Sequence, residues 1–351
     1  MQVAERTPRE TGLSTMRAVT QRAYGSAEVL AVKTVDRPTV AADEVLVEVV
    51  AAGLDRGVWH LMTGLPYLIR IMGFGFRRPK NPVPGADVAG RVAAIGDDVT
   101  RFAVGDEVFG IADGSFAEFA RAKESKLIHK PRNISFEMAG VSTISGMTAL
   151  QALTTVGRVA AGDHVLVIGA SGGVGSFAVQ LAKAFGATVT GVASGPKLEM
   201  VRSLGADRLI DYQAGDPVDG AIRYDAIIDI GGRNPLAKLR RAMTSDGTLV
   251  IVGGEGADVV TGGIGRQLRA AALSPFVSQR LTFFVASEDH GGLEDLLDLV
   301  AEGHVKPSID RAYRLCQVPD ALADLASGRI AGKAVIDIQR PADSDHEEAR
   351  S

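Results

Sequence analysis

Cysteine is nearly missing from this chain, because Cys316 is the only one among 351 residues. One thiol can form neither an internal disulfide nor a zinc site built from several thiolates. Long apolar runs are missing too, since none reaches the roughly 18 residues that a membrane-spanning helix needs. The polar amino-terminal segment lacks the apolar core of a signal peptide. We therefore expect a cytoplasmic protein of a reducing compartment, with no membrane partner.

A strong charge of either sign is also missing. Lys and Arg total 38 and Asp and Glu total 42, which gives a formal net charge of -4. Nucleic-acid-binding domains are typically basic, so the sequence predicts no nucleic-acid partner. Glycine, by contrast, is abundant at 41 residues, which indicates many tight turns. The length favours two domains.

The first third of the chain has the pattern of a β-rich domain. Apolar runs such as residues 45–50 and 88–95 are short and are separated by Gly, Pro and Asp. They predict a compact antiparallel, barrel-like domain. Residues 61–84 differ, since they mix aromatic, aliphatic and basic side chains without a period. They predict either a loop with short helices beside a pocket or an apolar flap over the core. A membrane-contact helix is disfavoured because Gly and Pro interrupt it.

From about Ser135, a plausible helix N-cap, strands and helices alternate. A strand at 165–169 precedes an amphipathic helix at 175–185, and a second strand follows at 187–193. This order predicts a doubly wound parallel sheet of the α/β class. The expected organisation is a flexible leader at 1–15, a catalytic β domain at 16–133, a dinucleotide-binding domain at 134–275, a return to the catalytic domain at 276–340 and a disordered tail at 341–351.

A glycine-rich turn, GASGGVG at residues 169–175, joins the first of these strands to its helix. A pyrophosphate needs backbone N–H donors that no side chain obstructs, and it gains from a helix N-terminus pointing at it. The pattern A-x-G-x-x-G therefore predicts a dinucleotide site, with a turn that serves only packing as the alternative. The predicted cofactor-binding residues of the turn are Ala170, Gly172, Gly173, Val174 and Gly175.

The end of the second strand bears on which dinucleotide binds. An NAD site usually has Asp or Glu there, on the ribose 2′-hydroxyl. This strand ends without an acid and offers Ser194 and Lys197, which suit a 2′-phosphate and favour NADP(H). Tyr212, just past the third strand, would flank the same phosphate. The alternatives are a solvated helix-start lysine and a half-buried surface tyrosine.

Four further stretches extend the pattern: PGADVAG at 84–90, VGDEVFG at 104–110, GMTA at 146–149 and LGAD at 204–207. With the glycine turn they resemble the medium-chain dehydrogenase/reductase superfamily, over about residues 16–338. The chain is most similar to its zinc-free quinone oxidoreductase and alcohol dehydrogenase-like branch. The resemblance implies an N-terminal GroES-like β-barrel domain, a Rossmann-type doubly wound parallel sheet and a homodimer formed through edge strands. Residues 257–264 are a candidate dimer segment, or a solvent loop.

The resemblance also assigns positions. The zinc branch has Gly-His-Glu where this chain has Gly85-Ala86-Asp87, and its structural zinc needs four cysteines, so we expect no metal. By this resemblance Asp55 occupies a position where an Asn is common in quinone oxidoreductases, which leaves the substrate open. By resemblance, the nicotinamide side of the cleft is lined by Thr148, Gly231, Gly253, Phe284 and Val285, with Lys333 near the cofactor.

The candidate catalytic residues are Asp55, His60 and Tyr67, with Trp59 beside them. His60 would donate a proton if Asp55 held its other nitrogen, and Tyr67 would donate through its phenol. Packing roles are the alternative. The expected reaction is hydride transfer from NADPH to a quinone or α,β-unsaturated carbonyl, a small-molecule substrate. The alternatives are an enoyl-thioester or aldehyde/ketone reductase, and a non-catalytic NADPH-binding sensor or scaffold.

Overall fold

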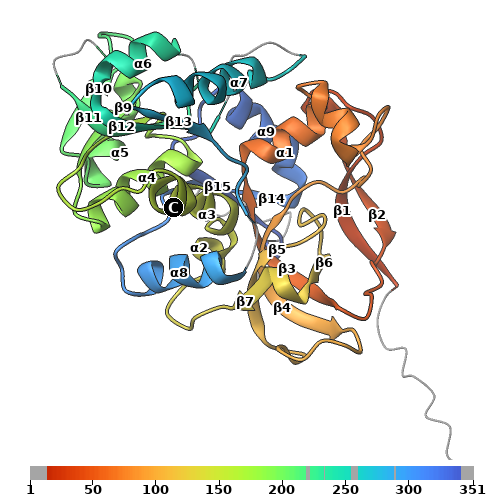
Figure 1. The fold of residues 1–351 in the computed structure, drawn as a ribbon. Coiled ribbons are helices and arrows are strands. Elements are labelled where there is room, and N and C mark those ends of the chain that lie inside the picture. Colours follow the sequence, from red (N-terminus) through yellow and green to blue (C-terminus); the bar gives the residue numbers. More distant parts are fainter. Residues whose placement is uncertain (1–13, 219–221, 233, 254–259, 288–289, 341–351) are drawn as a thin grey trace, which may run out of the picture.

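The computed structural model describes residues 14–218, 222–232, 234–253, 260–287 and 290–340. Two bodies lie side by side, one built on a barrel-like sheet and one on a helix-flanked parallel sheet (Figure 1). Our expectations for residues 1–15 and 341–351 fall outside the described ranges, apart from residues 14 and 15. Within the described part of the chain, no helix is both long and apolar enough to cross a bilayer.

The barrel body is a sheet drawn from both ends of the chain. Its strands in spatial order are β14 (Ile309–Arg314), β15 (Lys333–Asp337), β3 (Glu44–Leu54), β4 (Asp87–Ile95), β5 (Glu107–Ile111) and β7 (Leu127–His129), with β6 (Phe119–Lys123) paired to β3. A separate antiparallel pair joins β1 (Thr15–Gln21) to β2 (Leu30–Asp36). Only the β14–β15 pair is parallel within the described sheet. The predicted antiparallel barrel-like domain is thus confirmed.

The second body is a parallel sheet of the order β10-β9-β8-β11-β12-β13. Its strands are β8 (His164–Ile168), β9 (Thr188–Ala193), β10 (Arg208–Asp211), β11 (Tyr224–Asp229), β12 (Met243–Ile251) and β13 (Arg280–Phe283). Its helices are α4 (Gly173–Ala184), α5 (Leu198–Ser203), α6 (Leu236–Ala242) and α7 (Ile264–Leu273). The chain leaves β8 toward β9 on one side and later returns on the other side as β11. That reversal is the switch point at which open parallel sheets bind ligands.

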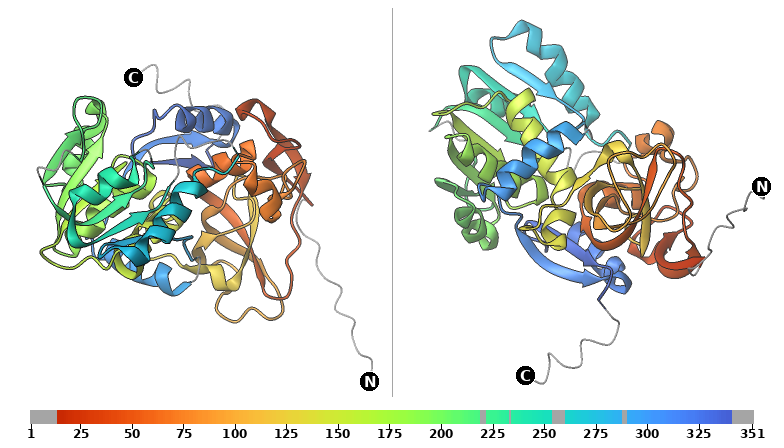
Figure 2. Two further views of the ribbon diagram at one scale, coloured as in Figure 1. Left: turned by 45° about the horizontal axis from the view of Figure 1, so that its top comes forward. Right: turned by 90° about the horizontal axis from the view of Figure 1, so that it is seen from below.

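One expected boundary differs from the structure. We expected the return to the first domain at residue 276, but residues 280–283 still extend the parallel sheet as β13, and the first strand of the return is β14. A strand of four residues has too few positions for its apolar pattern to show which sheet it joins. The carboxyl-terminal segment, blue in Figure 2, lies between the two bodies in both views.

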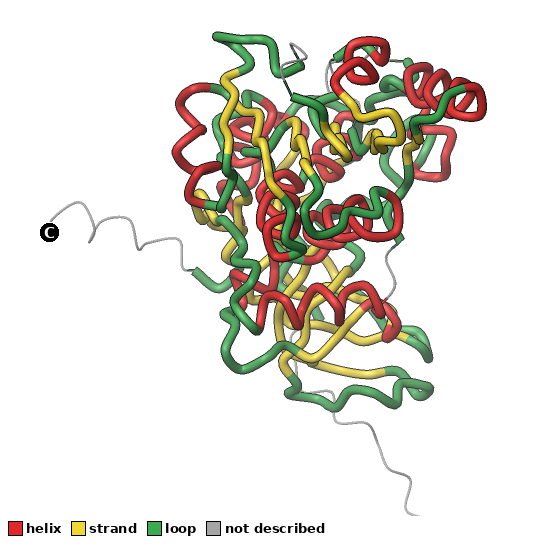
Figure 3. The backbone as a smooth tube through the Cα atoms, turned by 60° about the vertical axis from the view of Figure 1, so that its left-hand side comes forward, coloured by secondary structure: helices red, strands yellow, loops and turns green. Residues whose placement is uncertain are grey.

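Five further helices connect or cover the sheets. They are α1 (Arg56–Thr63), α2 (Phe136–Gly140), α3 (Thr143–Gln151), α8 (His290–Ala301) and α9 (Val318–Ala326). Ser135 is the N-cap of α2, as predicted, since its hydroxyl accepts the Met138 N–H at 3.2 Å. Helix α3 packs on α4 and α8 around Met147, Phe177 and Leu296. Figure 3 shows most helices gathered around the parallel sheet, while strands dominate the other body.

Candidate functional site

Three glycines meet at the carboxyl edge of the parallel sheet. Gly169 follows β8, and a methyl group added to it would lie 3.3 Å from the Gly231 nitrogen, just past β11. A methyl group on Gly253, which follows β12, would lie 2.3 Å from the Ile230 carbonyl oxygen. The structure therefore brings Gly231 and Gly253 together with the glycine turn, at the edge where such sheets bind nucleotides.

The glycine turn forms a narrow cradle at the start of α4. A methyl group on Gly175 would lie 2.1 Å from the Gly169 carbonyl oxygen, so only glycine lets the helix approach β8 this closely. Gly172, the N-cap of α4, would meet nothing closer than 3.5 Å, and it is partly exposed. The N–H groups of a first helical turn have no acceptor within the helix. The open side at Gly172 thus leaves room for a phosphate to accept them.

A buried lysine lies directly beside this cradle. Lys333, the first residue of β15, is 1% exposed, and its Cδ would be 3.1 Å from a methyl group on Gly173. Its Nζ donates to the Ser145 hydroxyl at 3.0 Å and lies 3.5 Å from the Asp87 carboxylate. Asp87 is fully buried, and its Oδ1 accepts the Ile144 N–H at 2.9 Å. Two barrel strands therefore present a charged pair to the cofactor domain.

Asp55 belongs to the same buried cluster. It is 8% exposed, its Oδ1 accepts the Val58 N–H at 3.2 Å, and its Oδ2 has no hydrogen-bond partner in the described structure. Burial raises the pKa of Asp87 to about 7, Lys333 opposes that rise, and the negative charge of Asp55 adds to it. The cluster thus holds two acids against one cation.

The predicted pairing of Asp55 with His60 is wrong. Asp55 precedes α1 in extended conformation, with φ -137° and ψ 170°, so its carboxylate turns back to cap the first helical turn. His60 lies on α1, and its Nδ1 is 2.8 Å from the Leu65 carbonyl oxygen. Because a carbonyl oxygen only accepts, Nδ1 carries the proton, and the neutral ring has none on Nε2.

Tyr67 lies apart from Asp55 as well. It is about half exposed, and the Arg70 guanidinium stands 4.7 Å from its ring centre. Trp59 packs edge-on against His60, with ring centres 5.1 Å apart. The structure thus divides the predicted catalytic set: the charge of Asp55 acts on the buried Asp87, whereas the contacts of His60 and Tyr67 are with Leu65 and Arg70.

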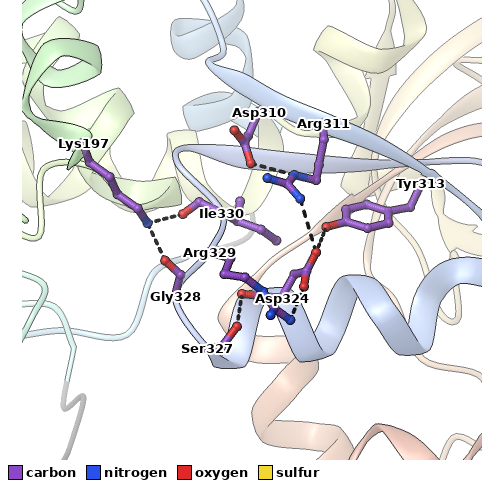
Figure 4. Close-up of polar contacts among 9 residues, drawn as sticks. All are labelled: Lys197, Asp310, Arg311, Tyr313, Asp324, Ser327, Gly328, Arg329 and Ile330. Carbon is purple, nitrogen blue, oxygen red and sulfur yellow. Dashed lines mark hydrogen bonds and ion pairs between the residues drawn. The ribbon is translucent and has the colours of Figure 1, made fainter.

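At the end of the second strand, β9, Lys197 has partners that the sequence did not indicate. Its Nζ donates to the carbonyl oxygens of Gly328 at 2.7 Å and Ile330 at 2.6 Å (Figure 4). Burial lowers its pKa, and the charge of Asp310 opposes that shift. The side chain is therefore neither simply solvated nor aimed only at a phosphate. An ammonium has three protons, so one remains for another acceptor.

The turn that holds Lys197 is itself braced by a carboxylate. Asp324 of α9 accepts the Tyr313 hydroxyl at 2.6 Å and pairs with Arg329 at 2.5 Å (Figure 4). Burial, followed by the hydrogen bond to Asp324, raises the pKa of Tyr313 to about 12. Gly328 lies between Asp324 and the strand β15, so this network fixes the carbonyls that Lys197 contacts.

An acid that the sequence reasoning missed stands beside the same pocket. Asp211 ends β10 and pairs in register with Ala193 of β9. A methyl group on Gly195 would lie 2.7 Å from its Oδ2. Tyr212 follows it, half exposed, and its N–H donates to the Ala193 carbonyl at 3.2 Å. The signal was the DY pair itself, since parallel pairing with β9 places both residues at this edge.

A second missed carboxylate lies at the end of β11. Asp229 is fully buried, accepts the Gly232 N–H at 3.0 Å and pairs with Arg266 of α7. Arg266 also donates to the Asn234 carbonyl at 3.1 Å. These contacts draw α7 across the carboxyl edge of the sheet.

The remaining predicted residues vary in their surroundings. Ser194 is the N-cap of the short 3-10 turn Gly195–Lys197, and the Thr148 hydroxyl donates to the Ile144 carbonyl at 2.7 Å. Phe284 packs on the core, whereas Val285 is 90% exposed. Within the described residues, no group of three His, Cys, Asp or Glu side chains is arranged to hold a metal ion.

The two glycines of the cradle predict separable effects. Gly172→Ala should cost at most about 1 kcal/mol of stability, because its methyl group meets only ordinary contacts. It should nevertheless weaken dinucleotide binding at least about tenfold by blocking the phosphate. Gly175→Ala should lose about 1–3 kcal/mol of stability as well, because its methyl group clashes with backbone. Chemical denaturation and cofactor titration measure both, and wild-type affinity in Gly172→Ala would refute the cradle.

The buried cluster predicts a titration near neutral pH. Between about pH 4 and about pH 7 the folded chain keeps a proton on Asp87 that the unfolded chain has lost. This group's contribution to the free energy of unfolding therefore falls as pH rises through that window. In Lys333→Met the opposing cation is gone, so the pKa of Asp87 should rise further.

The measurement is an infrared pH titration of the protonated carboxyl C=O stretch, assigned by its loss in Asp87→Asn. We expect a midpoint near pH 7 in the wild type. In Lys333→Met it should lie at least about one unit higher. An Asp87 that is ionised at about pH 5 in the wild type, or a midpoint unmoved in Lys333→Met, contradicts this account.

Comparisons with known proteins agree with this architecture. Residues 41–132 match the family model of the alcohol dehydrogenase GroES-like domain, and residues 204–336 match that of zinc-binding dehydrogenases. The chloroplast envelope quinone oxidoreductase homolog of Arabidopsis thaliana is 30% identical over 344 residues, covering 92% of this chain and 98% of that protein. The 2-methylene-furan-3-one reductase of Solanum lycopersicum is 33% identical over 341 residues, covering 92% and 79%.

Among solved structures, the quinone oxidoreductase from Coxiella burnetii superposes with a TM-score of 0.82 at 28% identity, covering 93% of this chain and all of that one. The fold that these proteins share binds a nicotinamide cofactor. This chain is therefore an oxidoreductase that belongs to the quinone oxidoreductase-like branch of the medium-chain dehydrogenase/reductase superfamily.

Proposed function

We propose that the chain is a zinc-independent, NADPH-dependent reductase that delivers hydride to a quinone or an α,β-unsaturated carbonyl. The observation that carries the proposal is the glycine cradle at Gly172 and Gly175 with the buried Lys333 alongside it. A helix N-terminus and a cation together suit a pyrophosphate. When bound, the cofactor supplies the hydride.

The chain's own residues would bind and orient. The N–H groups at the start of α4 hold the pyrophosphate, and the glycines after β11 and β12 leave the edge flat for the nicotinamide half. Lys333 neutralises phosphate charge in exchange for part of its contact with Asp87. Thr148, Phe284 and Val285 remain proposed neighbours of the nicotinamide.

The proposed zinc independence rests on which side chains are available to bind a metal ion. Cys316 is exposed and solitary in the sequence, and Ala86 stands where the zinc branch has a histidine ligand. Asp87, at the next position, is already held by Lys333 and the Ile144 N–H. Without a Lewis acid, an isolated carbonyl or an alcohol is a poor substrate, whereas conjugation spreads the developing charge. The named reaction of the tomato relative, a reductase of a methylene-furanone, supports the enone class.

We propose Tyr67 rather than His60 as the proton donor. His60 must be doubly protonated to donate from Nε2, because its Nδ1 proton is committed to the Leu65 carbonyl. The phenol of Tyr67 is itself an O–H donor and needs no second proton. Asp55 is a positioning residue in this proposal, acting on α1 and on the charge of the buried cluster.

The proposed preference for NADPH rests on Ser194, Lys197 and Tyr212. The carboxylate of Asp211 opposes this preference. Lys197 retains one proton for a 2′-phosphate, and β9 ends without an acid. The carboxylate of Asp211 beside Gly195 would instead favour a ribose hydroxyl. We propose that the phosphate is nonetheless accepted, because the cation outweighs one partly screened acid.

The proposal keeps two alternative activities and includes a homodimeric assembly. An enoyl-thioester or aldehyde/ketone reductase would use the same site, and a non-catalytic NADPH-binding sensor or scaffold would bind without turnover. A cytoplasmic homodimer fits the exposed Phe276 and Val285 beside the edge strand β13. The dimer candidate at residues 257–264 lies partly outside the described ranges.

Cofactor choice is tested by the ratio of NADPH to NADH affinity. Asp211→Asn should raise this ratio about tenfold by removing a negative charge near the phosphate, and Lys197→Met should lower it by at least as much. Lys197→Met also loses the contacts with the Gly328 and Ile330 carbonyls at the interface between the domains. The affinity for one cofactor alone therefore does not report cofactor preference. Isothermal titration with both cofactors supplies the ratio, and an unchanged ratio in both variants removes the case for NADPH.

The reaction is tested with a panel of quinones, enones and saturated carbonyls. We expect NADPH oxidation with the first two, unaffected by a zinc chelator. Tyr67→Phe should slow single-turnover reduction about 100-fold, and His60→Asn should slow it less. Tyr24→Phe is the matched control, since its hydroxyl is bound to the Gly75 carbonyl and the proposal gives it no part in proton transfer. Tight NADPH binding without turnover of any substrate would favour the sensor or scaffold instead.

A further inference from the structure

Residues 56–86 contain no Asp or Glu, in a chain whose net charge is -4. The cations of this segment are Arg56, Arg70, Arg77, Arg78 and Lys80. The segment is flanked by two carboxylates, those of Asp55 and Asp87, and both are buried. The segment is therefore a local basic region on an otherwise mildly acidic protein.

Large apolar side chains are exposed in the middle of this segment. Within six residues Ile71 is 68% exposed, Met72 64%, Phe74 46% and Phe76 69%; these four form what we call the apolar tip. Single exposed apolar residues are ordinary, but a contiguous group marks a surface that contacts something other than water.

Side-chain contacts fix the backbone on both sides of the apolar tip. Arg70 donates to the Gly64 carbonyl at 2.9 Å, and its guanidinium stands 4.4 Å from the ring centre of Tyr24. The Tyr24 hydroxyl in turn donates to the Gly75 carbonyl at 2.5 Å. The backbone on both sides of the tip is thus anchored while its side chains point outward.

A basic collar follows the tip directly. Arg77, Arg78 and Lys80 are exposed, and within the described ranges none of them is paired with a carboxylate. Their charge is available to an external anion, whereas the charges of Arg17 and Arg91, which are also exposed, face the carboxylates of Glu118 and Glu107.

The apolar surface continues across the seam between the domains. The Leu68 N–H donates to the Val260 carbonyl at 3.2 Å, and a methyl group on Gly262 would lie 2.5 Å from Pro66. Val260, which precedes α7, is 58% exposed, and Leu268 on α7 is 57% exposed. Figure 1 shows α7 beside the orange loops of the barrel body, so both domains border this surface.

We propose that the apolar tip and the basic collar dock the protein on a membrane surface that contains anionic lipids. Apolar side chains insert at the boundary of headgroups and acyl chains, while basic side chains contact the phosphates. The sequence argued against a membrane because glycine and proline interrupt any helix. In the structure, the tip is presented by the short π-helical segment Arg70–Phe74, which is interrupted at Gly73 with φ 102°, and by the residues that follow it, so no long amphipathic helix is involved.

The test is co-sedimentation of the full chain with vesicles of phosphatidylcholine alone and of phosphatidylcholine with phosphatidylglycerol. We expect binding to the anionic vesicles only, weakened by salt. Arg77→Gln/Arg78→Gln should lower the partition coefficient about 25-fold, at about fivefold for each basic side chain. Ile71→Ser/Phe76→Ser should lower it at least about tenfold.

Matched variants elsewhere serve as controls. Val104→Ser removes an apolar side chain of similar exposure, 66%, and Arg132→Gln/Arg202→Gln removes two exposed arginines outside the segment. Both should bind anionic vesicles as the wild type does. Equal binding to both vesicle types, binding to neither, or wild-type binding by the tip variant overturns the proposal. Thermal unfolding of each variant shows whether a loss of binding reflects misfolding, and Arg77→Gln/Arg78→Gln, being exposed, keeps the test decisive.

Discussion

The ion pair of Asp87 and Lys333 sets the geometry on which the site depends. Both residues begin strands of the barrel sheet, and both are essentially sealed from water. A buried charge is tolerated only where partners surround it, and breaking such a pair costs about 3–5 kcal/mol. The partners here are the Ile144 N–H and the Ser145 hydroxyl, at the start of α3. The pair therefore fixes where α3 meets the barrel, and it places Lys333 beside the first turn of α4.

The residues packed around Asp87 leave almost no space beside its carboxylate. A methyl group on Gly53 of β3 would lie 2.8 Å from the Asp87 carboxylate and 2.5 Å from the Gly140 carbonyl. Yet within the described structure the cluster of Asp55, Asp87 and Lys333 is not fully satisfied, since Asp87 Oδ2 and Asp55 Oδ2 lack hydrogen bonds. An anion arriving near Lys333 would compete with Asp87 for the cation. The raised pKa of Asp87 means that a proton can then neutralise the carboxylate, so the cluster can accept the anion without stranding a buried charge.

Local patterns in the sequence were enough for the fold and for the cofactor turn. A strand, a glycine turn and a helix follow one another within about twenty residues, and each has its own period or cap. The role of Asp55 was mistaken because spacing along a helix says nothing about a residue that precedes it as the cap. The partners of Lys197 were out of reach for another reason. Gly328 and Ile330 lie 131 and 133 residues away, and no local pattern predicts which carbonyls close a domain seam.

In the proposed function Lys197 serves both cofactor choice and the contact between the domains, which limits how either can vary. Its two carbonyl contacts belong to a turn braced by Asp324, so the ammonium is already oriented before any phosphate arrives. Preorganisation of this kind lowers the entropy lost on binding. The same contacts also mean that a substitution at Lys197 alters the seam as well as the phosphate site. Asp211 has no such second role at the interface between the domains, because within the described residues its hydrogen bonds are local to the end of β10. Variation of cofactor preference at constant fold is therefore easier at Asp211 than at Lys197.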